Sequence, residues 1–224
     1  MKKTYFGGTI MFSLLMIYIL ASIGLGIMLA YMGEKRFRSL TTAGTFLLLS
    51  LIGLAMLTPK MSFLMASLFS FISAAILAVC AFYFASCRHF LFGFCFGCMI
   101  SVAVLSFFAK SLTAWYGIAI ILLSGAVLGV LSIIYRRFLS ILSTSFVGAF
   151  FAVCNFMLLT IGFESLIGIY RAGSAAFSGY GSSVLGMLTR FPTIFLISLS
   201  VVGILGVILQ FLITAPRSSG KKRR

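Results

Sequence analysis

Few side chains in this sequence are of the types that carry out enzyme chemistry. Asp is absent, Glu occurs only as Glu34 and Glu164, and His89 is the one imidazole. Proton transfer and nucleophilic catalysis need paired groups, and metal catalysis needs several ligands. His89 follows Arg88 in a basic turn, where an interfacial contact is the expected role. The sequence therefore predicts a protein that is not an enzyme and that holds no cofactor or metal.

The five cysteines include one spacing that resembles a metal or redox motif. Cys95 and Cys98 have CxxC spacing, but they lie in an apolar segment without other cysteines or histidines at zinc-site spacing. Packing as buried thiols is the expected role for these two and for Cys80 and Cys154. Cys87 differs because it lies beside a basic residue at the end of an apolar segment, and it is a candidate for reversible acylation.

Asn155 and Gln210 are the only side-chain amides, and both lie inside apolar segments. An unpaired amide in hydrocarbon is costly, so each must bond to another helix or face a water-filled cavity. We expect hydrogen bonds between helices, and contacts in a pore are the alternative. A carrier driven through carboxylates is disfavoured because neither acid lies near the middle of an apolar segment.

These polar side chains belong to a very apolar chain. Of the 224 residues, 62% are hydrophobic and 8% are charged, and the mean hydropathy is +1.23. This composition excludes a soluble enzyme and is typical of a multi-pass helical membrane protein. The 17 Lys and Arg against two acids raise the question of nucleic acid, but basic residues beside apolar segments normally contact lipid. We expect the lipid bilayer and other membrane proteins as partners, and no nucleic acid.

Seven apolar segments are long enough to cross roughly 30 Å of hydrocarbon as helices. We expect them at 9–32, 40–57, 62–86, 90–109, 114–135, 138–162 and 191–214. Continuous apolar sequence, without strict alternation, favours helices over a barrel. The predicted fold class is an all-α membrane protein with seven transmembrane helices, in one domain over 1–214, followed by a short basic tail over 215–224.

The basic residues predict the orientation of these segments. Eleven of the 17 lie on the side of the carboxyl terminus and six on the side of the amino terminus. Positively charged connections favour the cytoplasm, so the carboxyl terminus is expected inside and the amino terminus outside. The membrane would be a bacterial cell membrane or, in a eukaryote, the endoplasmic reticulum or another endomembrane. In a bacterium, Lys221 and Lys222 would contact lipid headgroups. In a eukaryote, the same two residues would act as a dilysine retrieval signal.

Three expected turns have a similar sequence. Phe37, Phe90 and Phe138 each follow basic residues, and each precedes a small residue by seven positions. This similarity predicts three tandem helical hairpins plus a seventh helix. The alternative is that basic and aromatic residues mark the ends of the segments independently.

Two glycine pairs indicate close packing of helices. Gly93 and Gly97 have Gly-xxx-Gly spacing, as do Gly125 and Gly129. Because lipid gives helices no hydrophobic reason to associate, contact between small residues is a common basis of packing. We interpret both pairs as packing surfaces within the chain, with dimerisation as the alternative.

The connection 163–190 is much longer than the others and is rich in small residues. A mobile linker is the expected state of this connection. The alternatives are a cap on the bundle, an interfacial helix at 184–188 or a partner-binding segment.

Three stretches of the sequence are similar to one known family. Residues 135–148 read Tyr-Arg-Arg-Phe-Leu-Ser-Ile-Leu-Ser-Thr-Ser-Phe-Val-Gly, 206–211 read Gly-Val-Ile-Leu-Gln-Phe, and 33–37 read Gly-Glu-Lys-Arg-Phe. They resemble the seven-span family that includes transmembrane protein 198, with transmembrane 7 superfamily member 3 as a more distant relative. Tyr135 departs from the family, which often has Trp there, and the tail is short.

The resemblance implies a fold and a topology, with no catalytic chemistry. Together with the absence of catalytic residues, it leads us to expect an accessory or scaffold protein that binds other membrane proteins or lipids. An uncoupled channel or small-solute facilitator, lined by hydroxyls and the two amides, is the alternative function.

Overall fold

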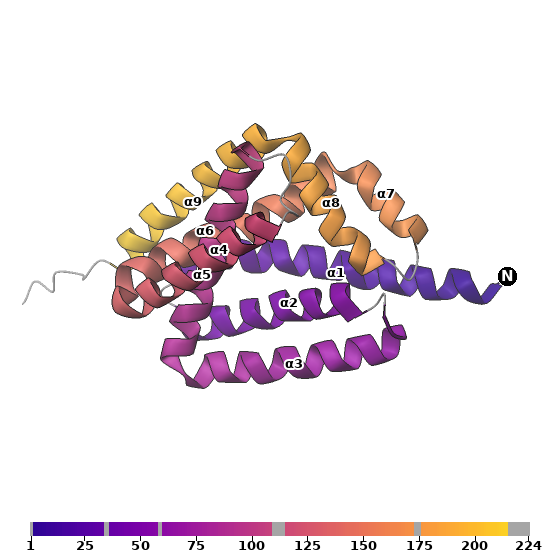
Figure 1. The fold of residues 1–224 in the computed structure, drawn as a ribbon, viewed down its shortest axis with the longest axis horizontal. Coiled ribbons are helices and arrows are strands. Elements are labelled where there is room, and N and C mark those ends of the chain that lie inside the picture. Colours follow the sequence, from indigo (N-terminus) through magenta and orange to yellow (C-terminus); the bar gives the residue numbers. More distant parts are fainter. Residues whose placement is uncertain (1, 34–35, 58–59, 109–114, 173–175, 215–224) are drawn as a thin grey trace, which may run out of the picture.

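The computed structural model describes residues 2–33, 36–57, 60–108, 115–172 and 176–214, and these form nine α-helices and no strand (Figure 1). The all-α prediction is confirmed for this part of the chain. The helices are α1 (Lys2–Met32), α2 (Phe37–Leu57), α3 (Phe63–Tyr83), α4 (Ala85–Phe108), α5 (Trp115–Ile134), α6 (Arg136–Thr160), α7 (Phe163–Ala172), α8 (Ala176–Arg190) and α9 (Pro192–Thr214).

Six of these helices are long and apolar enough to cross a membrane, in a search limited to the described residues: α1, α3, α4, α5, α6 and α9. Their outer faces carry large apolar side chains that a soluble protein would bury. Leu64, Leu123 and Leu212, for example, are each more than two-thirds exposed. The structure is thus compatible with a multi-pass membrane protein. The helix α2, which corresponds to the predicted second span, is not among the six.

Hydroxyl side chains inside the helices bond to their own backbone. The Thr45 hydroxyl donates to the Thr41 carbonyl oxygen at 2.8 Å, and the Thr144 hydroxyl donates to the Ser140 carbonyl oxygen at 2.7 Å. Such bonds let Ser and Thr lie in an apolar helix without an unpaired polar group. Pro192 is the first residue of α9, where its missing N–H has no intrahelical partner to lose.

The first three helices lie side by side, and α6 and α9 pack on α1 on the opposite side from α3 (Figure 1). The helix α4 rises from the end of α3 at a steep angle to it. The start of α1 and the end of α9 lie at opposite ends of the molecule. The centre of the bundle is formed by α6, whose residues are buried along most of its length.

The hairpin repeat is not confirmed. Among helices that follow each other in the chain, the extensive contacts are between α2 and α3 and between α4 and α5, while α1 packs along α6. The prediction paired α1 with α2, α3 with α4 and α5 with α6. The observed pairs are offset from these by one helix. The similar turns nonetheless lie together, as the next subsection describes.

The packing glycines account for the α4–α5 pair. An added Cβ at Gly97 would lie 2.5 Å from the Ser124 carbonyl oxygen, and one at Gly125 would lie 2.7 Å from the Cys98 sulfur. Gly93 of α4 faces Ser132 of α5, and Gly129 of α5 faces Phe90 of α4. All four glycines therefore lie in the contact between α4 and α5, where Gly93 and Gly97 approach the partner backbone closely.

The long connection 163–190 is not a mobile linker in its described residues. It forms α7 and α8, which pack against each other and against α1, α2 and α6 (Figure 1). The residues 184–188, for which an interfacial helix was one alternative, are part of the longer α8. Small residues misled the prediction, because Gly and Ser are tolerated in a helix that packs closely on its neighbours.

Candidate functional site

The similar basic turns converge at one end of the bundle. The helices α2, α4 and α6 all begin there, and they contribute Arg38, Arg88, His89 and Arg136. Arg88 lies within electrostatic reach of Arg38, and His89 lies within reach of Arg88 and Arg136. We call these four residues the basic cluster. The three turns that resemble each other in sequence therefore lie close together in the structure.

His89 is fixed in the basic cluster by contacts on several sides. Its Nδ1 atom lies 2.8 Å from the Ser140 hydroxyl, and its backbone oxygen accepts a hydrogen bond from Ser132 at 2.8 Å. The Phe37 ring stacks on the imidazole, with 4.9 Å between ring centroids. These contacts hold the imidazole in place, and the interfacial role expected from the sequence stays a prediction.

Arg38 and Arg88 share one backbone acceptor. Arg38 Nε donates to the Phe82 carbonyl oxygen at 3.2 Å, and Arg88 Nη1 donates to the same oxygen at 3.3 Å. The Arg88 guanidinium also lies over the Phe37 ring, 5.4 Å from its centroid. The Nε atom of Arg88 is buried and has no hydrogen-bond partner among the described residues.

The charge of the basic cluster is not balanced by a described carboxylate. Among the described residues Glu164 is the only acid, and it follows the far end of α6, the helix that Arg136 begins. Guanidinium groups held close together favour an anion with several oxygens, since phosphate accepts their fork of N–H donors. Chemically, the basic cluster therefore suits an anion with several oxygens, such as a phosphate group.

The amide of Gln210 ties α9 to two other helices. Its Nε2 atom donates to the carbonyl oxygens of Leu29 and Ala30, each at 2.9 Å. Its Oε1 atom lies 3.2 Å from the Thr144 hydroxyl, which shares its proton between this oxygen and the Ser140 carbonyl oxygen. Leu29 and Ala30 belong to the last turn of α1, where backbone carbonyls run short of partners within the helix. Gln210 is only 1% exposed, so its amide contacts protein and not lipid.

The amide of Asn155 binds the segment that was expected to be a linker. The Tyr180 hydroxyl, on α8, donates to Asn155 Oδ1 at 2.8 Å, and Asn155 Nδ2 donates to the Phe151 carbonyl oxygen at 2.8 Å. The Tyr18 ring of α1 meets the Tyr180 ring edge-on at 6.0 Å. Burial raises the pKa of Tyr180, so its hydroxyl stays protonated and remains a donor.

The cysteines form no metal-ligand group in the structure. All five are free thiols, and no three His, Cys, Asp or Glu residues cluster among the described residues. Cys98 contacts the carbonyl oxygen of Ile121 across the α4–α5 pair at 3.5 Å. Cys87 is half-buried near the start of α4. Lys221 and Lys222 lie outside the described residues.

The sequence did not reveal several residues that matter at these sites. Tyr180 lies in a stretch of Gly, Ser and Ala that gave no sign of a buried helix. Ser140 and Thr144 are among many hydroxyl residues of α6, and only their position relative to His89 and Gln210 distinguishes them. Their four-residue spacing, which puts both on one face of α6, is the one signal that was available.

Comparisons of the chain with models of protein families, with curated proteins and with solved structures found no match. The fold and sites described above therefore rest on this chain alone.

Proposed function

We propose that this chain is a non-enzymatic accessory or scaffold protein that crosses the membrane seven times and binds lipids or other membrane proteins through the basic cluster. Lipid phosphate is the ligand that the cluster fits best. The observation that carries this proposal is the convergence of Arg38, Arg88 and Arg136 around His89, without a carboxylate among the described residues nearby.

The seventh crossing in this proposal is α2. It has 21 residues, which at 1.5 Å per residue gives roughly 31 Å, enough to span the hydrocarbon. It lies alongside α1 and α3 (Figure 1). With this crossing, the two termini lie on opposite sides, and the basic residues favour a cytoplasmic carboxyl terminus. The basic cluster would then face the cytoplasmic leaflet, which is commonly anionic.

The two amides support a binding role over a channel or facilitator. Asn155 and Gln210 were the residues best suited to line a polar path. Instead, each donates to and accepts from groups on the protein, and each is 1% exposed. Gln210 uses both of its amide N–H groups on carbonyl oxygens of α1, and both amides are too buried to meet a passing solute.

We propose a relationship to the transmembrane protein 198 family on the similar stretches alone, and the structure gives three of their residues a place in this chain. Three residues of the similar stretches are Thr144, Gly206 and Gln210. They meet at the junction of α1, α6 and α9: Gln210 contacts Thr144, and an added Cβ at Gly206 would lie 2.6 Å from the Ala30 carbonyl oxygen.

A lipid-binding measurement tests the proposal. The purified protein in detergent is titrated with phosphatidylglycerol or with phosphatidylcholine, and the midpoint of thermal unfolding is followed. We expect phosphatidylglycerol to stabilise the protein more. Arg88→Gln and Arg136→Gln should each weaken this effect by about 1 kcal/mol, or roughly five-fold in affinity, the value of one basic residue near an anionic surface.

The matched control is Lys60→Gln, which removes one positive charge from the exposed turn between α2 and α3. It should bind phosphatidylglycerol nearly as the unmodified protein does. Equal stabilisation by the two lipids would contradict the proposal. Solute or ion flux into liposomes that Asn155→Leu or Gln210→Leu abolishes would favour the facilitator instead.

A further inference from the structure

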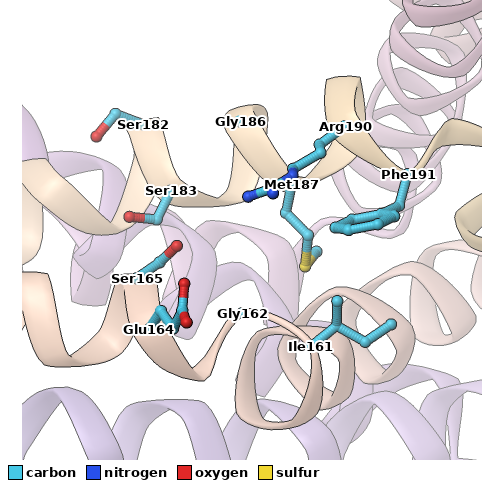
Figure 2. A pocket seen from close by; sticks show the side chains of 10 residues that line it. All are labelled: Ile161, Gly162, Glu164, Ser165, Ser182, Ser183, Gly186, Met187, Arg190 and Phe191. Atoms are coloured by element: carbon cyan, nitrogen blue, oxygen red, sulfur yellow. The ribbon is translucent and has the colours of Figure 1, made fainter.

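A cavity of about 330 Å³ lies at the opposite end of the bundle from the basic cluster (Figure 2). It forms where α6 ends, where α7 and α8 face each other and where α9 begins. Its lining is made of Ile161, Gly162, Glu164, Ser165, Ser182, Ser183, Gly186, Met187, Arg190 and Phe191. The volume is at the small end of the range for ligand sites, and neither Asn155 nor Gln210 lines it.

The cavity holds a negative and a positive side chain. Glu164 lies in the first turn of α7 and Arg190 in the last turn of α8. These helices run in opposite directions, so the two ends come together. Each charge suits the dipole of its own helix end, and this explains why a chain with only two acids tolerates a carboxylate here.

The two charges form no ion pair with each other within the described residues. The Arg190 guanidinium lies over the Phe191 ring, 5.6 Å from its centroid. Figure 2 shows the Glu164 carboxylate and the Ser165 hydroxyl directed toward α8, and the Arg190 guanidinium extending back along α8 over the same space. An acceptor and a donor of opposite charge are therefore both available to a ligand.

A zwitterion with a primary ammonium and an oxyanion matches these groups. The Glu164 carboxylate and the serine hydroxyls accept hydrogen bonds from an ammonium, and the Arg190 fork donates to phosphate oxygens. A trimethylammonium has no N–H donors and is normally bound by several aromatic rings. Phe191 is the one aromatic residue in this lining, so the site favours ethanolamine over choline.

The depth of the cavity points to a lipid as the source of the zwitterion. It lies just beyond the end of α6 at Thr160 and at the start of α9 at Pro192, and both are candidate spans. That is the depth of the headgroups. We propose that this cavity binds the headgroup of an ethanolamine phospholipid, with its ammonium on Glu164 and its phosphate on Arg190, beside the apolar side chains of Ile161 and Phe191.

The test compares lipids that differ only in the headgroup amine. The protein is placed in nanodiscs of phosphatidylcholine, without or with one-fifth phosphatidylethanolamine, and bound lipid is measured by mass spectrometry after gentle extraction. We expect enrichment of phosphatidylethanolamine over phosphatidylcholine. Glu164→Gln should reduce this enrichment about ten-fold, the effect of one charge-assisted hydrogen bond. Arg190→Gln should reduce retention of both lipids.

Two controls make the result interpretable. Glu164 is exposed and unpartnered within the described residues, so Glu164→Gln should unfold in lipid-free detergent as the unmodified protein does. Lys60→Gln should keep the enrichment. Equal retention of the two lipids by the unmodified protein would overturn the proposal. So would binding of free alanine or O-phosphoethanolamine as tight as that of the lipid, since the ligand would then be a soluble zwitterion.

Discussion

Replacing Gln210 with Leu should destabilise the bundle, because the Gln210 amide is the point where α9, α1 and α6 are joined. The change keeps a similar volume but removes three hydrogen bonds, two to the backbone of α1 at 2.9 Å and one from Thr144 at 3.2 Å. Interhelical hydrogen bonds in membranes average about 0.6 kcal/mol each, so their sum is about 2 kcal/mol. Leu gains little in return, because lipid is as apolar as the protein interior.

The assay is equilibrium unfolding of the purified protein in mixed micelles, as a function of the denaturing detergent. We expect the free energy of unfolding to fall by about 2 kcal/mol for Gln210→Leu, and by less for Thr144→Val. In the double variant the two effects should not add, because the residues share one hydrogen bond. The control Leu212→Ala changes a side chain that is 68% exposed and should have little effect.

Two outcomes would refute this reasoning. An unfolding free energy of Gln210→Leu within about 0.3 kcal/mol of the original would mean that the amide does not hold the helices together, since this difference is below the value of one such bond. Additive effects of Thr144→Val and Gln210→Leu would mean that the Thr144–Gln210 contact carries no energy.

Three further predictions concern packing, the cap and topology. Gly26→Ala should destabilise the protein by roughly 1–3 kcal/mol in the same unfolding assay, because the added Cβ would lie 2.7 Å from the Ala152 nitrogen. In the control Gly24→Ala the added Cβ meets nothing within 4 Å, so this change should be neutral or slightly stabilising. Tyr180→Phe leaves Asn155 Oδ1 without its donor, and it should speed hydrogen exchange in α8 by a factor matching roughly 1–3 kcal/mol. The control Tyr83→Phe, at a 71% exposed site, should leave the exchange rate of α8 unchanged. Equal exchange rates in the two variants would contradict the role of the Tyr180–Asn155 bond. In a variant without native cysteines, an impermeant thiol reagent applied to intact cells should label Ser182→Cys and leave Ser219→Cys unlabelled; the reverse pattern would invert the proposed orientation.

The helical character of the chain was predictable because it depends on composition. In hydrocarbon, a continuous apolar segment can pair all its backbone groups within itself only as a helix. Predicted segments such as 138–162 therefore agree closely with helices such as α6. The amides could be located in the same way, because Asn155 and Gln210 stand out as rare polar groups. What each amide would contact could not be predicted, since its partners Tyr180 and Leu29 are distant in the sequence.

The pairing of helices was not predictable for a related reason. It depends on which faces meet, and in an apolar chain both faces look alike. Gly26 and Gly148 bring α1 and α6 into backbone contact, with an added Cβ at Gly148 lying 2.5 Å from the Ala30 nitrogen. These glycines are 122 positions apart, and neither belongs to a Gly-xxx-Gly pair that would have marked it. The cavity near Glu164 depends on the α7–α8 pair and was hidden for the same reason.

Native mass spectrometry of the protein extracted from a membrane that contains anionic phospholipid tests the central claim most directly. The number of retained anionic lipids is counted for the unmodified protein, for the triple variant Arg38→Gln, Arg88→Gln and Arg136→Gln, and for Lys60→Gln. Our account predicts at least one anionic lipid retained by the unmodified protein and by Lys60→Gln, and its loss from a triple variant that still unfolds cooperatively. Equal retention by all three proteins would show that the basic cluster does not bind lipid phosphate.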